Sequence, residues 1–147
     1  VQGYAALSWA NLADGIRSRT FEIRYKNIVF MVGHSDLEMS RADLKDAMKE
    51  VFALIRAYNP EVKIFVSTLP PNAYSDDENA KVAKWNQGLH AVYLKCKLQF
   101  KNLFLIKTHE VCMSRTVPIT MMYQGAMLNL SGAMTVLHYI IGHVLVK

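Results

Sequence analysis

The chain is poor in cysteine and has no long apolar run, and both absences exclude whole classes of protein. Two cysteines in 147 residues, Cys96 and Cys112, cannot form a disulfide framework, and no second pair completes a zinc site. Two free thiols are typical of a reducing compartment, so we expect a cytoplasmic protein without a metal. Residues 133–146 are the most apolar stretch, but His138 and His143 interrupt it. This stretch is too short and too polar to span a bilayer, and it predicts a buried helix.

The N-terminus lacks both the apolar run of a secretory leader and an initiator methionine. We therefore expect the chain to be a fragment of a larger protein. Its composition, 52% hydrophobic and 20% charged, is globular, and its length suits one domain over residues 1–147. The net charge of +5 suits an anionic partner.

Buried apolar runs alternate with amphipathic stretches along the chain. The runs at 28–32, 63–67 and 103–106 predict strands that are buried on both faces. Apolar spacings of three and four predict helices over about 7–18, 40–58, 76–96 and 131–146. This alternation predicts an α/β fold, a three-layer sandwich in which helices flank a parallel sheet. We expect Val51, Trp85 and Ile140 to be buried.

Three segments in this order carry a resemblance to a known family. Gly33-His34-Ser35-Asp36 follows the first predicted strand, and residues 66–71, with Asn86 downstream, end the second. The third segment, residues 124–132, precedes the last predicted helix. Together they resemble sequence blocks of the SGNH (GDSL-type) hydrolases, which implies a flavodoxin-like sandwich. The family's first block, with its nucleophilic serine, has no counterpart in this sequence, and we expect it to lie before Val1.

The resemblance breaks at three positions that carry chemistry in the family. Ser35 stands where the family has an asparagine that donates to the oxyanion. Gln124 and Met127 stand where it has its catalytic aspartate and histidine. An amide takes no proton near neutral pH, and a thioether is a weak acceptor. These losses imply a hydrolase scaffold without catalytic residues, so we expect a pseudoenzyme that needs no cofactor.

Positive charge gathers ahead of the first predicted strand, with few acidic neighbours. Guanidinium groups bind phosphates in bidentate fashion, so this region predicts an RNA-binding surface. The predicted contacts are Arg17, Arg19, Arg24 and Lys26, extended by Arg115 in the long loop. A further set, Lys81, Lys84 and Lys95, shares one sector of its predicted helix.

In combining basic charge with lost catalytic residues, the chain resembles the C-terminal domains of the insect Oskar proteins, which belong to the same superfamily. That resemblance implies a developmental protein that binds RNA, and messenger RNA above all, in germ plasm. We expect further protein partners to use other parts of the full-length protein, and we expect no membrane partner.

Two other functions stay open. The first is an esterase with an upstream serine and a base in an unusual place, and His109 in the long loop could supply that base. His34, Ser35 and Asp36 are adjacent, and consecutive residues of one turn rarely converge as a catalytic triad. The second is a protein-interaction scaffold whose basic charge is incidental.

Overall fold

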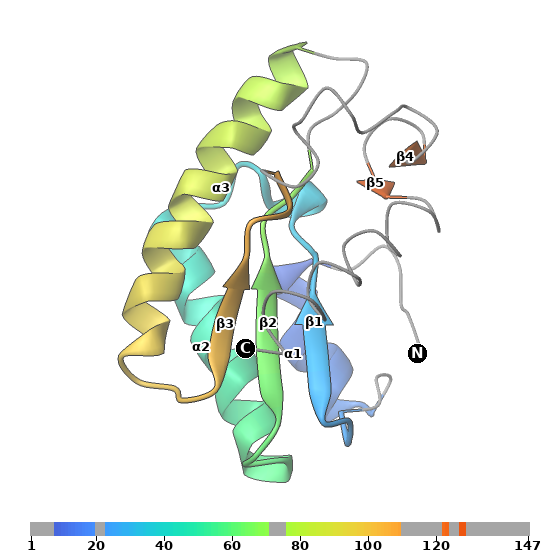
Figure 1. Ribbon diagram of the computed structural model, residues 1–147, viewed down its shortest axis with the longest axis vertical. Coiled ribbons are helices and arrows are strands. Elements are labelled where there is room, and N and C mark those ends of the chain that lie inside the picture. The colour runs from blue at the N-terminus through green and yellow to red at the C-terminus, as the bar shows by residue number, and fades with distance from the viewer. Residues whose placement is uncertain (1–7, 20–22, 71–75, 110–121, 124–126, 129–147) are drawn as a thin grey trace.

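The computed structural model describes residues 8–19, 23–70 and 76–109, and the short backbone segments 122–123 and 127–128. In chain order its elements are α1 (Trp9–Arg17), β1 (Asn27–Phe30), the 3₁₀ helix η1 (His34–Asp36), α2 (Arg41–Tyr58), β2 (Lys63–Ser67), α3 (Asp76–Lys97), β3 (Leu103–Ile106), β4 (Met122–Tyr123) and β5 (Met127–Leu128). The first three strands form a parallel sheet in the order β1-β2-β3 (Figure 1). β4 and β5 pair antiparallel.

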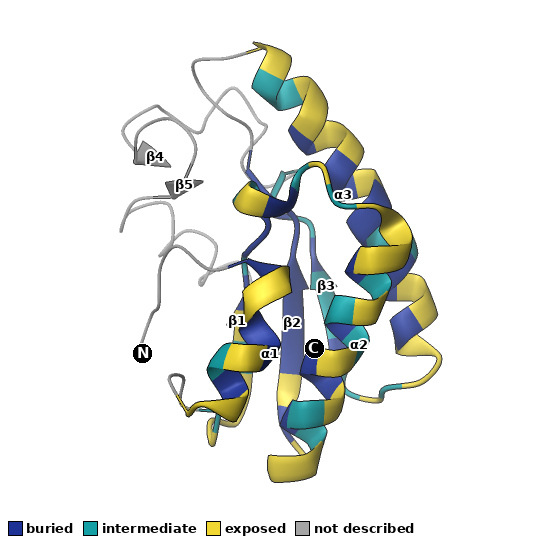
Figure 2. Ribbon diagram, turned by 180° about the vertical axis from the view of Figure 1, so that it is seen from behind, coloured by how far each residue is buried: buried dark blue, intermediate teal, exposed yellow. Residues whose placement is uncertain are grey.

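The crossovers of the parallel sheet place helices on one of its faces. The connections through α2 and then α3 each advance by one strand, so right-handed crossovers put both helices on the same side. Figure 2 shows α1 and α2 packed together in front of that face. The prediction of an α/β fold with a parallel sheet flanked by helices is therefore confirmed.

The hydrophobic core lies between this face of the sheet and the three helices. Its largest fully buried side chains are Trp9, Leu12, Leu44, Met48, Phe52, Ile55, Ile64, Leu69, Leu89 and Leu103. Val51 and Trp85 are buried, as predicted. Ile140 and the helix predicted over 131–146 lie outside the described residues.

The strand register separates the two faces of the sheet. Ile64 pairs with Leu103 in a row that faces the helix-side core. The next row contains Val29, Phe65 and Phe104, whose side chains point to the other face because strand residues alternate. There the rings of Phe65 and Phe104 stack with centroids 5.1 Å apart.

Helix α2 begins and ends as its sequence predicts. The Ser40 hydroxyl accepts from the backbone N–H of Asp43 at 3.1 Å, which satisfies one donor of the first turn. At the other end Asn59 leaves the helical conformation, and its amide donates to the carbonyls of Ile23 and Tyr25 at 3.0 and 2.8 Å. The C-terminal end of α2 is thereby tied to the segment that enters β1.

Arg56 braces the same end of the molecule. Its guanidinium donates to the carbonyl of Val62 at 2.5 Å, to that of Asn102 at 3.3 Å, and to that of Lys101. One side chain of α2 therefore joins the segments that lead into β2 and β3. Burial lowers the pKa of Arg56, and the charge of Glu61 opposes this shift more weakly.

Two smaller expectations concern cysteine and the membrane. Cys96 is a free, buried thiol, and burial raises its pKa above the ordinary value; Cys112 lies outside the described residues. Among the helices that the structure describes, none is long and apolar enough to cross a membrane.

Candidate functional site

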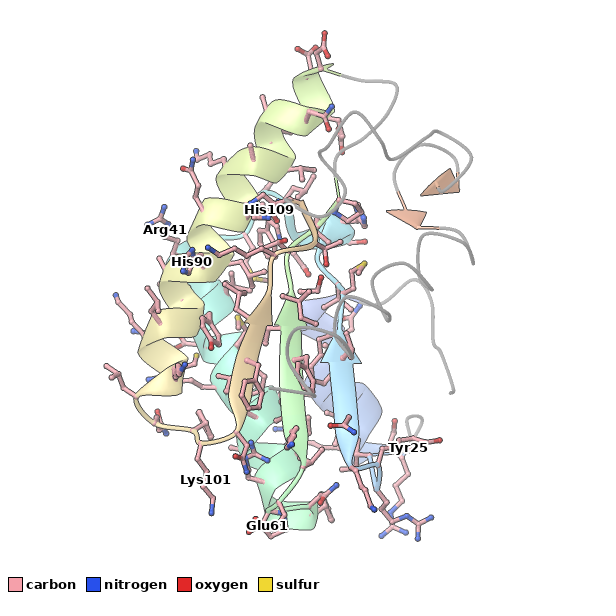
Figure 3. All side chains as sticks on the ribbon, viewed as in Figure 1. Tyr25, Arg41, Glu61, His90, Lys101 and His109 are labelled. Atoms are coloured by element: carbon pink, nitrogen blue, oxygen red, sulfur yellow. The ribbon has the colours of Figure 1, made fainter. Side chains whose placement is uncertain are left out.

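Polar side chains from three consecutive connections gather at the carboxyl edge of the parallel sheet. η1 follows β1, Thr68 follows β2, and His109 follows β3. Figure 3 shows His109 at this end of the molecule, whereas Tyr25, Glu61 and Lys101 lie at the opposite end. Open parallel sheets bind their ligands outside the carboxyl ends of the strands, so this edge is the candidate site.

The turn after β1 depends on Gly33 and on the ring of Trp85. Gly33 has a φ of 131°, a conformation that side chains rarely adopt. A Cβ built on Gly33 would lie 2.6 Å from Cζ2 of Trp85, so the indole packs directly on the backbone of the turn. This turn ends the strand two residues earlier than the predicted range 28–32, at Phe30.

Asp36 anchors the same turn to the first helix. Its carboxylate is buried and accepts from the backbone N–H of Trp9 at 2.8 Å. Its own backbone N–H donates to the carbonyl of Gly33 at 2.8 Å. The N-cap residue Ser8 makes no side-chain capping bond, so a carboxylate from a distant turn serves the start of α1.

His34 begins η1 and is partly buried. Burial lowers the pKa of this imidazole, and the nearby charge of Glu78 opposes the shift more weakly. His34 is therefore mainly neutral near pH 7, the form in which an imidazole can accept a proton. The next residue, Ser35, is exposed on the same turn.

Thr68 and His109 form a hydrogen-bonded pair between the ends of β2 and β3. Oγ1 of Thr68 lies 2.7 Å from Nδ1 of His109, 3.1 Å from the backbone N of His109 and 3.4 Å from the carbonyl oxygen of Ile106. A hydroxyl has one donor and two acceptor sites. All three contacts are used when Thr68 donates to Ile106 and accepts from both nitrogens. Nδ1 then carries the ring proton of His109, whereas Nε2 carries it when Thr68 donates to Nδ1 instead.

The residues that precede Thr68 and His109 in sequence, Ser67 and Thr108, form a pair of hydrogen-bonded hydroxyls. The Ser67 hydroxyl donates to the carbonyl of Thr68 at 2.8 Å, and it accepts from the hydroxyl of Thr108. Both side chains are buried, so they join the ends of β2 and β3 in a dry environment. The position of His109 is therefore fixed by its neighbours in sequence as well as by Thr68.

Asn86 holds helix α3 against the same edge. Its side-chain oxygen accepts from the backbone N–H of Leu69 at 2.8 Å, and its amide donates to the carbonyl of Leu69 at 3.0 Å. Asn86 is buried, and both of its bonds satisfy a segment that has left the ladder of β2. Asn86 therefore joins α3 to the segment that follows β2.

The structure places the sequence-predicted site residues unevenly. Gln124 and Arg115 lie outside the described residues, and only the backbone of Met127 is described, in β5. Arg17 is ion-paired with Asp14, at 3.3 Å, and with Glu50. Of the remaining predicted RNA contacts, Arg19 follows α1, whereas Arg24 and Lys26 precede β1; all three are exposed.

Sequence reasoning did not identify Thr68 or Thr108 as site residues, because no local pattern marks a hydroxyl whose partner is about forty positions away. Within the described ranges, no group of three His, Cys, Asp or Glu side chains could hold a metal ion.

The chain matches no family profile and no curated protein in sequence, but its fold is similar to solved structures. One is an acetyl esterase mutant with an acetate ion, 16% identical, with a TM-score of 0.70 over 98% of this chain and 69% of that one. A putative platelet activating factor from Streptococcus pneumonia is 11% identical, with a TM-score of 0.72 over 93% and 68%. A carbohydrate esterase family 3 protein from Talaromyces cellulolyticus is 15% identical, with a TM-score of 0.67 over 97% and 69%.

These similarities confirm an SGNH hydrolase-like fold, and they correct the prediction that the chain is not an enzyme. Two of the three structures are esterases, and each matches nearly the whole of this chain. The prediction relied on two expected replacements, Gln124 and Met127, and took them to mean that no group for proton transfer remains. The carboxyl edge of the sheet holds two other imidazoles, those of His34 and His109.

Proposed function

We propose that this protein is an ester hydrolase of the SGNH type that acts on small acyl esters such as acetyl esters. The fold supports the reaction class, and the neighbours described as acetyl and carbohydrate esterases support the substrate class. The observation that carries the proposal is the contact of 2.7 Å between Thr68 and His109 at the carboxyl edge of the sheet. A base that is oriented by a third group is the usual arrangement in acyl transfer.

His109 is the general base of the proposed reaction. Its Nε2 takes the proton of the attacking hydroxyl, from a serine or from water, as the new C–O bond forms at the ester carbonyl. The proton then passes to the alkoxide oxygen as the ester C–O bond breaks, so the alcohol leaves neutral. This step requires the tautomer with the ring proton on Nδ1, in which Thr68 accepts from that nitrogen and donates to the carbonyl of Ile106.

The turn after β1 supplies groups for the negative charge that develops on the carbonyl oxygen. Ser35 occupies the position where the family has an asparagine donor, and a hydroxyl is also a donor. Its exposure on the turn suits contact with a substrate. Gly33 and the Trp85 ring beneath it fix the backbone of this turn, and a fixed donor is what oxyanion stabilisation requires.

The first test is turnover of p-nitrophenyl esters by the purified full-length protein. We expect saturable hydrolysis of the acetate ester, and a lower kcat/KM for the octanoate ester because the similar structure described as an acetyl esterase supports a small acyl group. Heat-denatured protein gives the background rate of exposed side chains. If native protein hydrolyses the acetate ester no faster than denatured protein, the proposed activity is wrong.

We propose RNA binding as a second function, at the amino edge of the sheet. The supporting observation is a hollow of about 350 Å³ lined by three cations, Arg24, Lys26 and Lys63, and one carboxylate, Glu61. Tyr25 also lines it and is 40% exposed, so a ring stands beside the cations. Aromatic rings stack on unpaired bases while cations contact the phosphates. A role in germ plasm, implied by the resemblance to Oskar, belongs with this function.

Neutralising the amino-edge hollow tests the second function. The double variant Lys26→Gln and Lys63→Gln should weaken binding of single-stranded RNA by about tenfold at low salt, and it should reduce the salt slope by about 0.7 for each lost phosphate contact. The matched control is Lys81→Gln with Lys97→Gln, which removes equal charge from α3. Equal weakening by both pairs would show that net charge alone attracts the RNA.

A further inference from the structure

A second hollow lies between helices α2 and α3. Its volume is about 180 Å³. Figure 3 shows Arg41 beside α3, at one side of the molecule. We call this hollow the α2–α3 groove, and its lining residues are Arg41, Ala42 and Lys45 from α2, with Ala91, Val92 and Lys95 from α3. Neither of the functions proposed above uses any of them.

The three cations of the groove have no anionic partner among the described residues. Other cations of the chain do: Arg17 pairs with Glu50, Lys81 with Glu38 at 3.5 Å, and Lys101 with Glu61 at 3.8 Å. No salt bridge or hydrogen bond in the described ranges involves the side chain of Arg41, Lys45 or Lys95. Three like charges around one hollow repel each other, which makes the groove a site for an anion.

Two of the three acidic residues of α2 face away from the groove. At about 100° per residue, Asp43 and Glu50 lie roughly 160° and 180° around the helix from Arg41, whereas Asp46 lies only about 40° from the groove residue Ala42. Glu50 confirms this geometry, since it contacts Arg17 on α1. On α3 the carboxylates are confined to the first turn. The groove is therefore lined by positive and small apolar side chains without a carboxylate.

Gly88 allows the guanidinium of Arg41 to lie across α3. A Cβ built on Gly88 would lie 3.4 Å from Nε and 3.5 Å from Cγ of Arg41, so the arginine side chain packs on the bare backbone of the glycine. A larger residue at this position would push the arginine away. Packing therefore holds the guanidinium of Arg41 in the groove, and the charges of Lys45 and Lys95 add to its positive potential.

We propose that the α2–α3 groove binds a phosphoryl group. A guanidinium fork and two ammonium groups match the charge and the several acceptor oxygens of a phosphate. A volume of about 180 Å³ is roughly that of six water molecules, which suits a phosphate with a small organic part. The floor of Ala42, Ala91 and Val92 suits the apolar portion of such a ligand.

The test is a titration of isotope-labelled protein with inorganic phosphate and pyrophosphate, followed by amide NMR shifts at low salt. We expect the largest shifts at the residues of the groove, and tighter binding of pyrophosphate. The variant Arg41→Gln, Lys45→Gln, Lys95→Gln should weaken binding by at least about tenfold. The control Lys81→Gln, Lys97→Gln, Lys101→Gln removes equal charge and should change the affinity by less than about twofold.

A second variant separates geometry from charge. Gly88→Leu keeps every cation but displaces the side chain of Arg41, and it should also weaken pyrophosphate binding. The proposal is overturned if the groove residues show no shifts, or if the groove and control triples weaken binding equally. Adding single-stranded RNA as a competitor of bound pyrophosphate shows which kind of phosphate compound the groove binds. If RNA displaces pyrophosphate, the groove binds a nucleic-acid backbone. If pyrophosphate stays bound in the presence of RNA, the groove binds a small phosphorylated molecule.

Discussion

Replacing His109 by glutamine is expected to lower kcat for hydrolysis of an acetyl ester by about 10²- to 10⁴-fold, the usual contribution of a general base. Glutamine retains the size and polarity of the side chain but accepts no proton near pH 7. KM should change by less than about threefold, because the lost interaction belongs to the transition state. The measurement is steady-state kinetics of the parent and the variant, with matched circular dichroism spectra to show that both are folded.

The control is His90→Gln. His90 is a partly buried imidazole on α3, outside the set of groups that we place at the carboxyl edge. Its replacement should leave kcat at the parental value. Equal losses in the two histidine variants, or full activity in His109→Gln, would contradict the role of His109. If the parent is active and His109→Gln is too, esterase function survives and the base lies elsewhere.

Thr68 offers a finer test of the same pair, because its role is to position His109. Thr68→Val removes the hydroxyl at nearly constant volume and should reduce kcat by about tenfold, whereas Thr68→Ser keeps the hydroxyl and should restore most of it. A purely structural role of Thr68 predicts a different order, in which the valine variant is as active as the serine variant or more so.

Gly33→Val is expected to destabilise the domain by at least about 3 kcal/mol. A β-branched residue is strained at a φ of 131°, and its Cβ would stand 2.6 Å from the buried ring of Trp85. Overpacking of a close-packed core adds to this strain. Urea unfolding followed by tryptophan fluorescence measures the effect as a lower midpoint at constant slope.

A matched glycine substitution shows that position matters, rather than residue type. Gly15 lies within helix α1, where alanine should stabilise the domain by up to about 1 kcal/mol. If Gly33→Val unfolds at the same urea concentration as the parent, the close packing of Trp85 on the turn is wrong. The same variant should lose ester hydrolysis even where it remains folded, since the turn carries Ser35.

Much of the fold follows from local sequence. The apolar runs of β2 and β3, the stripe of α2 and the Ser40 cap are each defined by residues within one element, and the structure has them where the sequence predicts. The end of β1 was misplaced because Met31 and Val32 continue the apolar run. The strand instead ends at Phe30, and the chain turns three residues later at Gly33, whose φ is 131° and whose backbone packs against Trp85.

The candidate site was less accessible to sequence reasoning, because its contacts join distant parts of the chain. Asp36 contacts Trp9 across 27 positions, and Thr68 contacts His109 across 41. Neither pair leaves a pattern along the sequence. The motif around Gln124 and Met127 predicted missing catalytic residues, but no such motif shows which groups a parallel sheet brings together at its edge.

Arg56 has a consequence for how the domain opens. Its hydrogen bonds clamp the amino ends of β2 and β3 to α2, whereas the carboxyl edge consists of turns joined by side-chain hydroxyls. Amide protons near the arginine should therefore exchange with solvent only when the whole domain unfolds. The amides of η1 should be protected as well, because the carboxylate of Asp36 and the ring of Trp85 hold that turn. Both ends of the sheet would then open together, so a substrate would meet a carboxyl edge that is already in place.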